Sequence, residues 1–176
     1  PVAPAVEIIH KLYTQGVDEV IFFDILASAE KRSIDIATVR EVAKRVFVPF
    51  TVGGGLKTLD DLRAALKAGA EKVSIDSMAV RNPDLIRQGA VAFGRQCVVV
   101  SMQVRRVAPS AGIPSGFEIA IDGARVFTGM DAVAWARRAV ELGAGELCVN
   151  SIDHHGTHSR YDIPLVDEIC RAGHVP

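Results

Sequence analysis

Short, almost wholly apolar runs alternate along the chain with longer amphipathic stretches. The apolar runs cover residues 19–25, 50–53, 72–76, 97–103 and 146–152. Each run is continuously apolar instead of alternating with polar residues, which is typical of parallel strands that are covered on both faces. The pattern therefore predicts five parallel β-strands, each followed by a helix.

The amphipathic stretches between these runs carry helix signals. A stripe of apolar residues predicts a helix over roughly residues 33–46. Thr58 and Asp61 have the spacing of a capping box and predict the start of the next helix. Asn82 and Pro83 predict an N-cap and a first-turn proline for a third helix.

Strict alternation of strands and helices predicts an α/β fold. Right-handed βαβ crossovers then allow either an open, doubly wound sheet or a (β/α)8 TIM barrel. A weak internal repeat, a helix-ending glycine followed by a charge at the start of a strand, relates residues 16–19, 69–72 and 143–146. A full barrel runs to about 250 residues, so a chain of 176 residues is short for that fold.

The segment of residues 105–128 interrupts the alternation of strands and helices. Proline and glycine clusters are followed by apolar residues in strict alternation and then by Asp122-Gly123, a strong hairpin signal. We therefore expect a two-stranded insertion within one domain that spans residues 1–176. Such insertions lie over the active face of these folds, although a loop without function is an equal alternative.

Composition and charge exclude several classes of protein. Hydrophobic residues make up 49% and charged residues 23% of the chain, which is enough to form a core and argues against disorder. A net charge of −1 gives no attraction for nucleic acid. No apolar run approaches the roughly 20 residues of a membrane span, and the first 16 residues lack a signal peptide's apolar core. We expect a cytoplasmic protein with neither nucleic acid nor membrane as a partner.

In parallel α/β folds the chemistry gathers at the carboxyl ends of the strands. Gly53, Gly54 and Gly55 follow the second apolar run and precede the capped helix, a setting that favours a bound phosphate. A flexible turn explains the three glycines equally well. Ser77, after the third run, would add a hydroxyl to the same anion, whereas Asp76 beside it would repel a phosphate unless it is turned away.

A carboxylate at the end of the first strand is a further candidate. Burial there would tune Asp24 as a general acid or base. The structural alternative is an ion pair with Lys31 or Arg32.

The loop of residues 153–158 follows the last strand and holds three histidines. In this loop Gly156 and Thr157 would donate hydrogen bonds to an anion, although simple solvent exposure is as good an explanation. Neighbouring histidines on a turn point in different directions, and no Cys or Glu stands at ligand spacing. We therefore expect no metal, and nothing in the sequence predicts a cofactor.

Five segments together resemble the cyclase subunit of imidazole glycerol phosphate synthase. They are FFDILAS (22–28), PFTVGGG (49–55), GAEKVSIDSMAV (69–80), QCVVVS (96–101) and GAGELCVNSIDHHGTHSRYD (143–162). The resemblance implies a (β/α)8 barrel in which ammonia from a partner glutaminase subunit reacts with a phosphoribulosyl-formimino aminoimidazole nucleotide. The products are imidazole glycerol phosphate, for histidine biosynthesis, and an aminoimidazole carboxamide ribotide.

The resemblance also implies roles for individual residues. It places Gly55 and Ser77 in one phosphate site, and Gly156 with its neighbours in a second. It implies a ring of charges that gates ammonia at the starts of the strands, formed by Glu19, Lys72 and Glu146.

The chain departs from the family pattern at its catalytic positions. Of the family's two catalytic aspartates, one lies in a strand before residue 1, and the position of the other is Gln103. A neutral amide cannot act as a general acid or base. The proton transfers of ring closure, each typically worth roughly 10² to 10⁴ in rate, therefore have no catalytic group at this position. Asp76 stands in place of the usual asparagine, and His155 in place of the usual aspartate. Gln103 and Asp24 remain the candidate catalytic residues.

Three functions are compatible with this pattern. The first is the cyclase subunit with impaired activity, in an incomplete barrel that lacks the first strand and the last two βα units. The second is a cyclase-like paralogue that delivers ammonia to a sugar in surface polysaccharide amidation. The third is a noncatalytic, phosphate-binding or partner-binding barrel fragment. We take the first as the main hypothesis, and expect two copies of an incomplete barrel to associate through their unpaired strand edges.

Overall fold

The computed structural model describes residues 2–24, 27, 32–158 and 160–176. Its contacts divide the chain into two compact units, Pro1–Ile75 and Asp76–Pro176, which we call unit 1 and unit 2 and describe separately. The last residue of the expected first strand, Ile25, and the possible Asp24 partner Lys31 lie outside the described residues.

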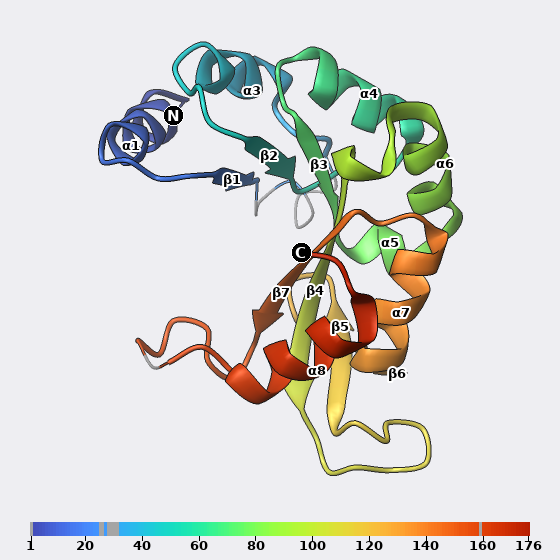
Figure 1. The fold of residues 1–176 in the computed structure, drawn as a ribbon. Coiled ribbons are helices and arrows are strands. Elements are labelled where there is room, and N and C mark those ends of the chain that lie inside the picture. Colours follow the sequence, from blue (N-terminus) through green and yellow to red (C-terminus); the bar gives the residue numbers. More distant parts are fainter. Residues whose placement is uncertain (1, 25–26, 28–31, 159) are drawn as a thin grey trace. The chain divides into compact units, whose positions relative to one another are not determined.

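Unit 1 is built around three parallel strands. They are β1 (Val20–Phe23), β2 (Phe50–Gly53) and β3 (Lys72–Ile75). Val20 lies opposite Phe50, and Val52 lies opposite Val73, so the three strands start at one end of the unit. Its helices are α1 (Val2–Thr14), α3 (Ile36–Ala43) and α4 (Leu59–Lys67), which follow one another along one side of these strands (Figure 1).

Local signals account for the helix starts, with one exception. The Thr58 hydroxyl accepts a hydrogen bond from the Asp61 amide at 3.2 Å, and the Asp61 carboxylate accepts one from the Thr58 amide at 2.9 Å, so the predicted capping box is confirmed. The prediction of Asn82 as an N-cap is wrong. Asn82 ends the short helix α5 (Ser77–Arg81), and Pro83 takes the N-cap position of α6 (Asp84–Phe93).

Unit 2 is built around the long strand β4 (Val98–Arg106). Strand β7 (Glu146–Ser151) pairs with β4 in parallel, and its register sets Asn150 directly opposite Gln103. Strand β5 (Phe117–Ile121) pairs with the last residues of β4 in antiparallel fashion, and β6 (Val126–Asp131) pairs with β5 (Figure 1). These two antiparallel strands occupy the segment for which the sequence predicts an insertion.

The strand β4 extends beyond its predicted end. The apolar pattern ends it at residue 103, whereas pairing with β5 carries it to Arg106. One charged residue in this extension is paired across the two strands, because the Arg105 Nε donates to the buried Glu118 carboxylate at 2.9 Å. Pairing of this kind lets a strand continue through residues that hydropathy alone assigns to a loop.

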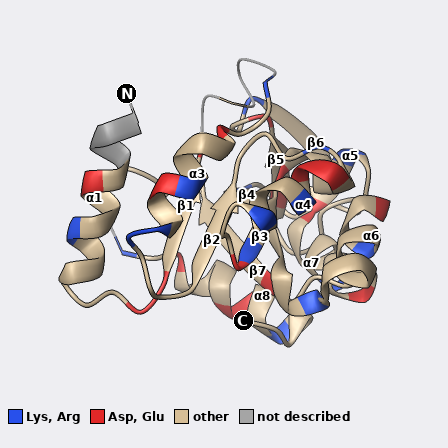
Figure 2. Cartoon of the chain, turned by 90° about the horizontal axis from the view of Figure 1, so that it is seen from above, with Lys and Arg blue, Asp and Glu red and all other residues tan. Residues whose placement is uncertain are grey.

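Two helices cap the later part of unit 2. They are α7 (Ala132–Leu142) and α8 (Ile163–Gly173), which pack against each other, and α7 buries Trp135, Ala136 and Ala139. Basic and acidic residues are interspersed on the helices of each unit (Figure 2). In the part of the chain that the structure describes, no helix has the length and apolar character needed to cross a membrane.

Candidate functional site

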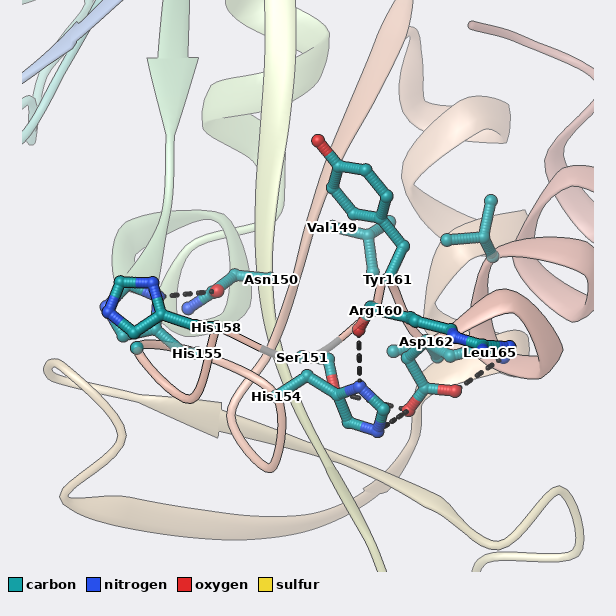
Figure 3. A pocket seen from close by; sticks show the side chains of 12 residues that line it. Val149, Asn150, Ser151, His154, His155, His158, Arg160, Tyr161, Asp162 and Leu165 are labelled. Atoms are coloured by element: carbon teal, nitrogen blue, oxygen red, sulfur yellow. Dashed lines mark hydrogen bonds and ion pairs between the residues drawn. The ribbon is translucent and has the colours of Figure 1, made fainter.

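The carboxyl ends of β4 and β7 carry a hydrogen-bonded pair of side-chain amides. The Asn150 Nδ2 donates to the Gln103 Oε1 at 2.7 Å. The Asn150 Oδ1 then faces the His155 Nδ1 at 3.2 Å (Figure 3). Because an amide oxygen only accepts, the His155 Nδ1 carries the hydrogen of this bond. The partners on either side thus fix the orientation of the Asn150 amide.

Asp76 completes this row of polar side chains. Its carboxylate lies close enough to the Gln103 side chain for that side chain to lower the pKa of Asp76. Burial raises the pKa of Asp76 to about 6, Gln103 opposes that rise, and the negative charge of Asp122 adds to it. Asp76 therefore exchanges a proton close to neutral pH, unlike an ordinary aspartate.

The β5–β6 turn lies next to this carboxylate through Asp122. The Asp122 carboxylate forms an ion pair with Arg81, and its amide donates to the Ser77 Oγ at 2.9 Å. The Ser77 hydroxyl oxygen is thus held by the turn. A role for Ser77 in binding phosphate stays a prediction.

A cavity of about 540 Å³ opens at the end of β7 (Figure 3). Its lining includes Asn150, His155 and Gly156, so the row of polar side chains reaches the cavity wall. On the opposite side of Figure 3, the His154 ring meets the Arg160 carbonyl oxygen at 2.7 Å and lies 3.9 Å from the Asp162 carboxylate. The cavity therefore combines an open loop with fixed polar groups, as small-molecule sites do.

The predicted second phosphate loop follows β7. Gly156 has a φ of +70°, and a Cβ added there would meet nothing within 4 Å. The Thr157 hydroxyl donates to the His154 carbonyl oxygen at 2.8 Å, within the loop. Both residues are exposed, and their phosphate role stays a prediction.

The glycines of the other predicted phosphate loop are required by the backbone of unit 1. Gly54 has a φ of +95°, and a Cβ there would lie 2.3 Å from the Asp24 carbonyl oxygen. Gly55 has a φ of +72°, and its Cβ would lie 2.7 Å from the Ala27 Cβ. Close approach of two backbone segments thus accounts for these glycines whether or not phosphate binds there.

The carboxylate of Asp24 takes part in a two-point ion pair. Arg32 donates from Nη1 and Nη2 to the two carboxylate oxygens at 2.5 and 2.9 Å. This is the structural alternative that the sequence left open for Asp24. A bidentate guanidinium favours the ionised carboxylate, and a catalytic role for Asp24 stays a prediction.

Two of the three predicted gate residues contact each other at the start of the unit 1 strands. The Lys72 Nζ donates to the Glu19 carboxylate at 3.0 Å, and the Thr51 hydroxyl donates to the same oxygen at 3.1 Å. Glu146 is the first residue of β7 and belongs to unit 2. Among the described residues, no three His, Cys, Asp or Glu side chains lie close enough to hold a metal ion.

The strand-end rule also nominates Asn150 and His155, but sequence reasoning gave them no specific role and treated Asp76 only as an obstacle to phosphate. A signal for Asp76 was nevertheless present. The resemblance places a carboxylate at position 103 and an amide at position 76, and this chain has Gln103 and Asp76. The two departures are reciprocal, and the two side chains are close enough for Gln103 to affect the pKa of Asp76.

Comparison with known proteins gives consistent matches. The family model described as "Histidine biosynthesis protein" matches residues 2–176. The chain is 54% identical over 171 residues to the imidazole glycerol phosphate synthase subunit HisF of Desulforapulum autotrophicum, covering 97% of this chain and 66% of that protein. It is 53% identical over 176 residues to the HisF subunit of Nitratidesulfovibrio vulgaris, covering 100% and 66%. The chain thus spans slightly less than two thirds of the length of these relatives.

Proposed function

The chain belongs to the histidine biosynthesis protein family, and on this premise we propose that it is the cyclase subunit of imidazole glycerol phosphate synthase. Membership of this family agrees with the (β/α)8-barrel fold predicted from the sequence. Strands β1, β2, β3, β4 and β7, with the helices that follow them, are βα units of such a barrel. The antiparallel strands β5 and β6 are an addition to that pattern.

Sequence identity carries this proposal. Identity of 53–54% extends over 97–100% of the chain in two relatives that are named HisF subunits. The matched length includes all the strand ends at which the polar residues of the site lie. The cavity at the end of β7 agrees with the rule that barrel enzymes bind substrates at the carboxyl ends of their strands.

The substrate of the proposed reaction carries a phosphate at each end, and the chain offers a loop for each. Gly54 and Gly55 follow β2, and Gly156 and Thr157 follow β7. Glycines with positive φ let consecutive backbone N–H groups point toward one anion. Ser77 would add its hydroxyl to the first of these loops.

The proposed partner is a glutaminase subunit that supplies ammonia. The opposite ends of the strands would then receive it, and there the Lys72–Glu19 ion pair lies at the starts of β3 and β1. An ion pair of this kind opens or closes by the rotation of two side chains, which fits a gate for a small neutral molecule. Glu146, at the start of β7, would contribute to the same ring.

A second candidate function is supported by one residue. Gln103 lies at a position for which the resemblance implies a catalytic carboxylate, and this favours a paralogue that passes ammonia to a different acceptor, such as a sugar. Such a protein would retain the gate and the glutaminase partner but would not close an imidazole ring.

Genetic complementation separates the two functions. The native gene is introduced, with the gene of its own glutaminase partner, into a bacterial strain from which the cyclase subunit gene has been deleted. We expect growth without added histidine, because ring closure is the missing step. An empty vector and growth with added histidine serve as controls. Soluble, abundant protein without growth would contradict the cyclase function and leave the sugar-amidating paralogue as the better account.

A further inference from the structure

We propose that His154 is a positioning residue, whose ring ties together the two ends of the loop between β7 and α8 and so fixes the backbone that binds a phosphate of the substrate. The loop comprises residues 152–158 and 160–161. The inference rests on the proposed function, which assigns a phosphate to this loop. The resemblance places Gly156 and its neighbours at that phosphate but does not say what holds them there.

The main chain of His154 organises the first half of the loop. Its amide donates to the Ser151 carbonyl oxygen at 3.2 Å, which turns the chain at the end of β7. Its carbonyl oxygen accepts from the Thr157 hydroxyl at 2.8 Å and from the Thr157 amide at 3.3 Å. Residues 154–157 thus form a closed turn. Gly156 is the third residue of that turn, and its φ of +70° is one that glycine adopts without strain.

The side chain of His154 connects this turn to the far end of the loop. The His154 Nδ1 meets the Arg160 carbonyl oxygen at 2.7 Å. Because a carbonyl oxygen only accepts, Nδ1 carries the hydrogen of this bond. The Nε2 on the other side of the ring lies 3.9 Å from the Asp162 carboxylate (Figure 3). A single ring thus lies against the last part of the loop and the start of α8.

The residue behind the ring is a fixed anchor. The Asp162 side chain is 1% exposed and forms an ion pair with Arg106 of β4. It also accepts from the Ser151 hydroxyl at 3.2 Å and from the Leu165 amide at 3.3 Å. Its partners belong to β4, β7 and α8, so three elements hold the carboxylate in place. His154 therefore sets the loop relative to the end of the sheet and to α8.

The hydrogen bonds of the turn decide which groups are left for an anion. The Thr157 hydroxyl and amide both donate to the His154 carbonyl oxygen, so their hydrogens serve the turn. In the part of the chain that the structure describes, the Gly156 amide donates to no protein group, and Gly156 lines the cavity. Phosphate binding here would therefore use the backbone at Gly156, whose orientation depends on His154.

The other two histidines of the loop do not form this bridge. The His155 Nδ1 bonds the Asn150 Oδ1 at 3.2 Å, on the opposite side of Figure 3 from the His154 ring. His155 and His158 are exposed, whereas His154 is half-buried. An imidazole has a nitrogen on each side of a rigid ring, and only the His154 ring is placed with one nitrogen toward Arg160 and the other toward Asp162, among the described residues.

Tryptic cleavage after Arg160, an exposed residue, tests the bridge without any substrate. In His154→Ala the loss of one hydrogen bond should raise the rate of cleavage of the native-state protein about 3- to 10-fold. His154→Gln also lacks the Nδ1 donor and should behave in the same way. In His154→Asn the amide nitrogen takes the place of Nδ1, so the rate should stay within about twofold of the native rate. His174→Ala, at an exposed histidine after α8, is the matched control and should not alter the rate.

Steady-state kinetics with ammonium as the nitrogen donor tests the link to phosphate. In His154→Ala the KM for the nucleotide should rise about tenfold with kcat within about threefold, because a phosphate distant from the reacting atoms contributes to binding. His154→Asn should restore the native KM. A merely structural role would lower the fraction of active protein, and therefore kcat, without moving KM.

The outcomes separate the inference from the function on which it rests. Equal cleavage at Arg160 in native protein, His154→Ala and His154→Gln would overturn the bridge, and His154→Gln alone decides this if His154→Ala does not fold. Faster cleavage with an unchanged KM would overturn the link to phosphate. Native protein without any turnover would overturn the proposed function, whereas the cleavage rates would still decide whether His154 holds the loop.

Discussion

The Asn150 Nδ2 donates to the Gln103 Oε1 across 2.7 Å, between directly opposite positions of the parallel strands β7 and β4. This bond connects a residue of the cavity wall to the residue that faces Asp76. The position of Gln103 is therefore set by the register of the two strands and by the side chains on both sides of its amide.

Replacing Asn150 should destabilise unit 2. In Asn150→Leu the half-buried Gln103 oxygen loses its donor, and an unsatisfied polar group of this kind costs about 1–3 kcal/mol in the free energy of unfolding. Urea denaturation of the native protein and the variant measures the difference. Asn82→Ala, at an exposed residue of the same unit, should change it by less than about 0.5 kcal/mol. Equal stabilities of Asn150→Leu and native protein would contradict the hydrogen bond.

Removing the charge of Asp76 should stabilise the protein, and only at high pH. The pKa of Asp76 is raised from 3.8 to about 6 by folding, so the folded state opposes ionisation. The penalty is absent below about pH 4 and complete above about pH 6, where it amounts to about 1–3 kcal/mol. Asp76→Asn should therefore unfold at higher urea concentration than native protein at about pH 8 and at a similar one at about pH 4. A loss of stability at the higher pH would contradict the raised pKa.

Asp162 should contribute stability that acid removes. This buried carboxylate pairs with Arg106, accepts from the Ser151 hydroxyl at 3.2 Å and caps α8. Burial alone would raise its pKa, but these bonds lower it overall, so the contribution is present above the unfolded pKa of about 4 and is lost as the pH falls through the lower, folded pKa. Asp162→Asn should cost about 3 kcal/mol at neutral pH and much less near pH 2. A cost independent of pH would argue against the ion pair.

The two glycine loops should respond differently to alanine. At Gly54 the φ of +95° and a Cβ only 2.3 Å from a carbonyl oxygen predict a loss of about 3 kcal/mol or more. At Gly156 the φ of +70° lies in open space, and the loss should be only about 1–2 kcal/mol. Thermal unfolding of both variants checks the order. Gly156 is therefore the better position for testing phosphate binding without unfolding the protein.

Features set by local sequence were predictable, and features set by long-range register were not. Continuous apolar runs located the five parallel strands, and the Thr58–Asp61 capping box depends only on neighbouring residues. The hydrogen bond between Gln103 and Asn150 joins residues 47 positions apart, and no single-chain pattern gives the register that aligns them. The pKa of Asp76 depends on burial by the folded chain. Asn82 was wrongly predicted as an N-cap because it is the C-cap of the short helix α5.

The most direct test of the central claim is ammonia-dependent turnover by the purified native protein. The phosphoribulosyl-formimino aminoimidazole nucleotide is supplied with ammonium at about pH 8, where Asp76 is ionised, and both products are quantified. We expect imidazole glycerol phosphate and the carboxamide ribotide in equal amounts. Folded native protein that binds the nucleotide and forms neither product would contradict the assignment of this chain as a cyclase.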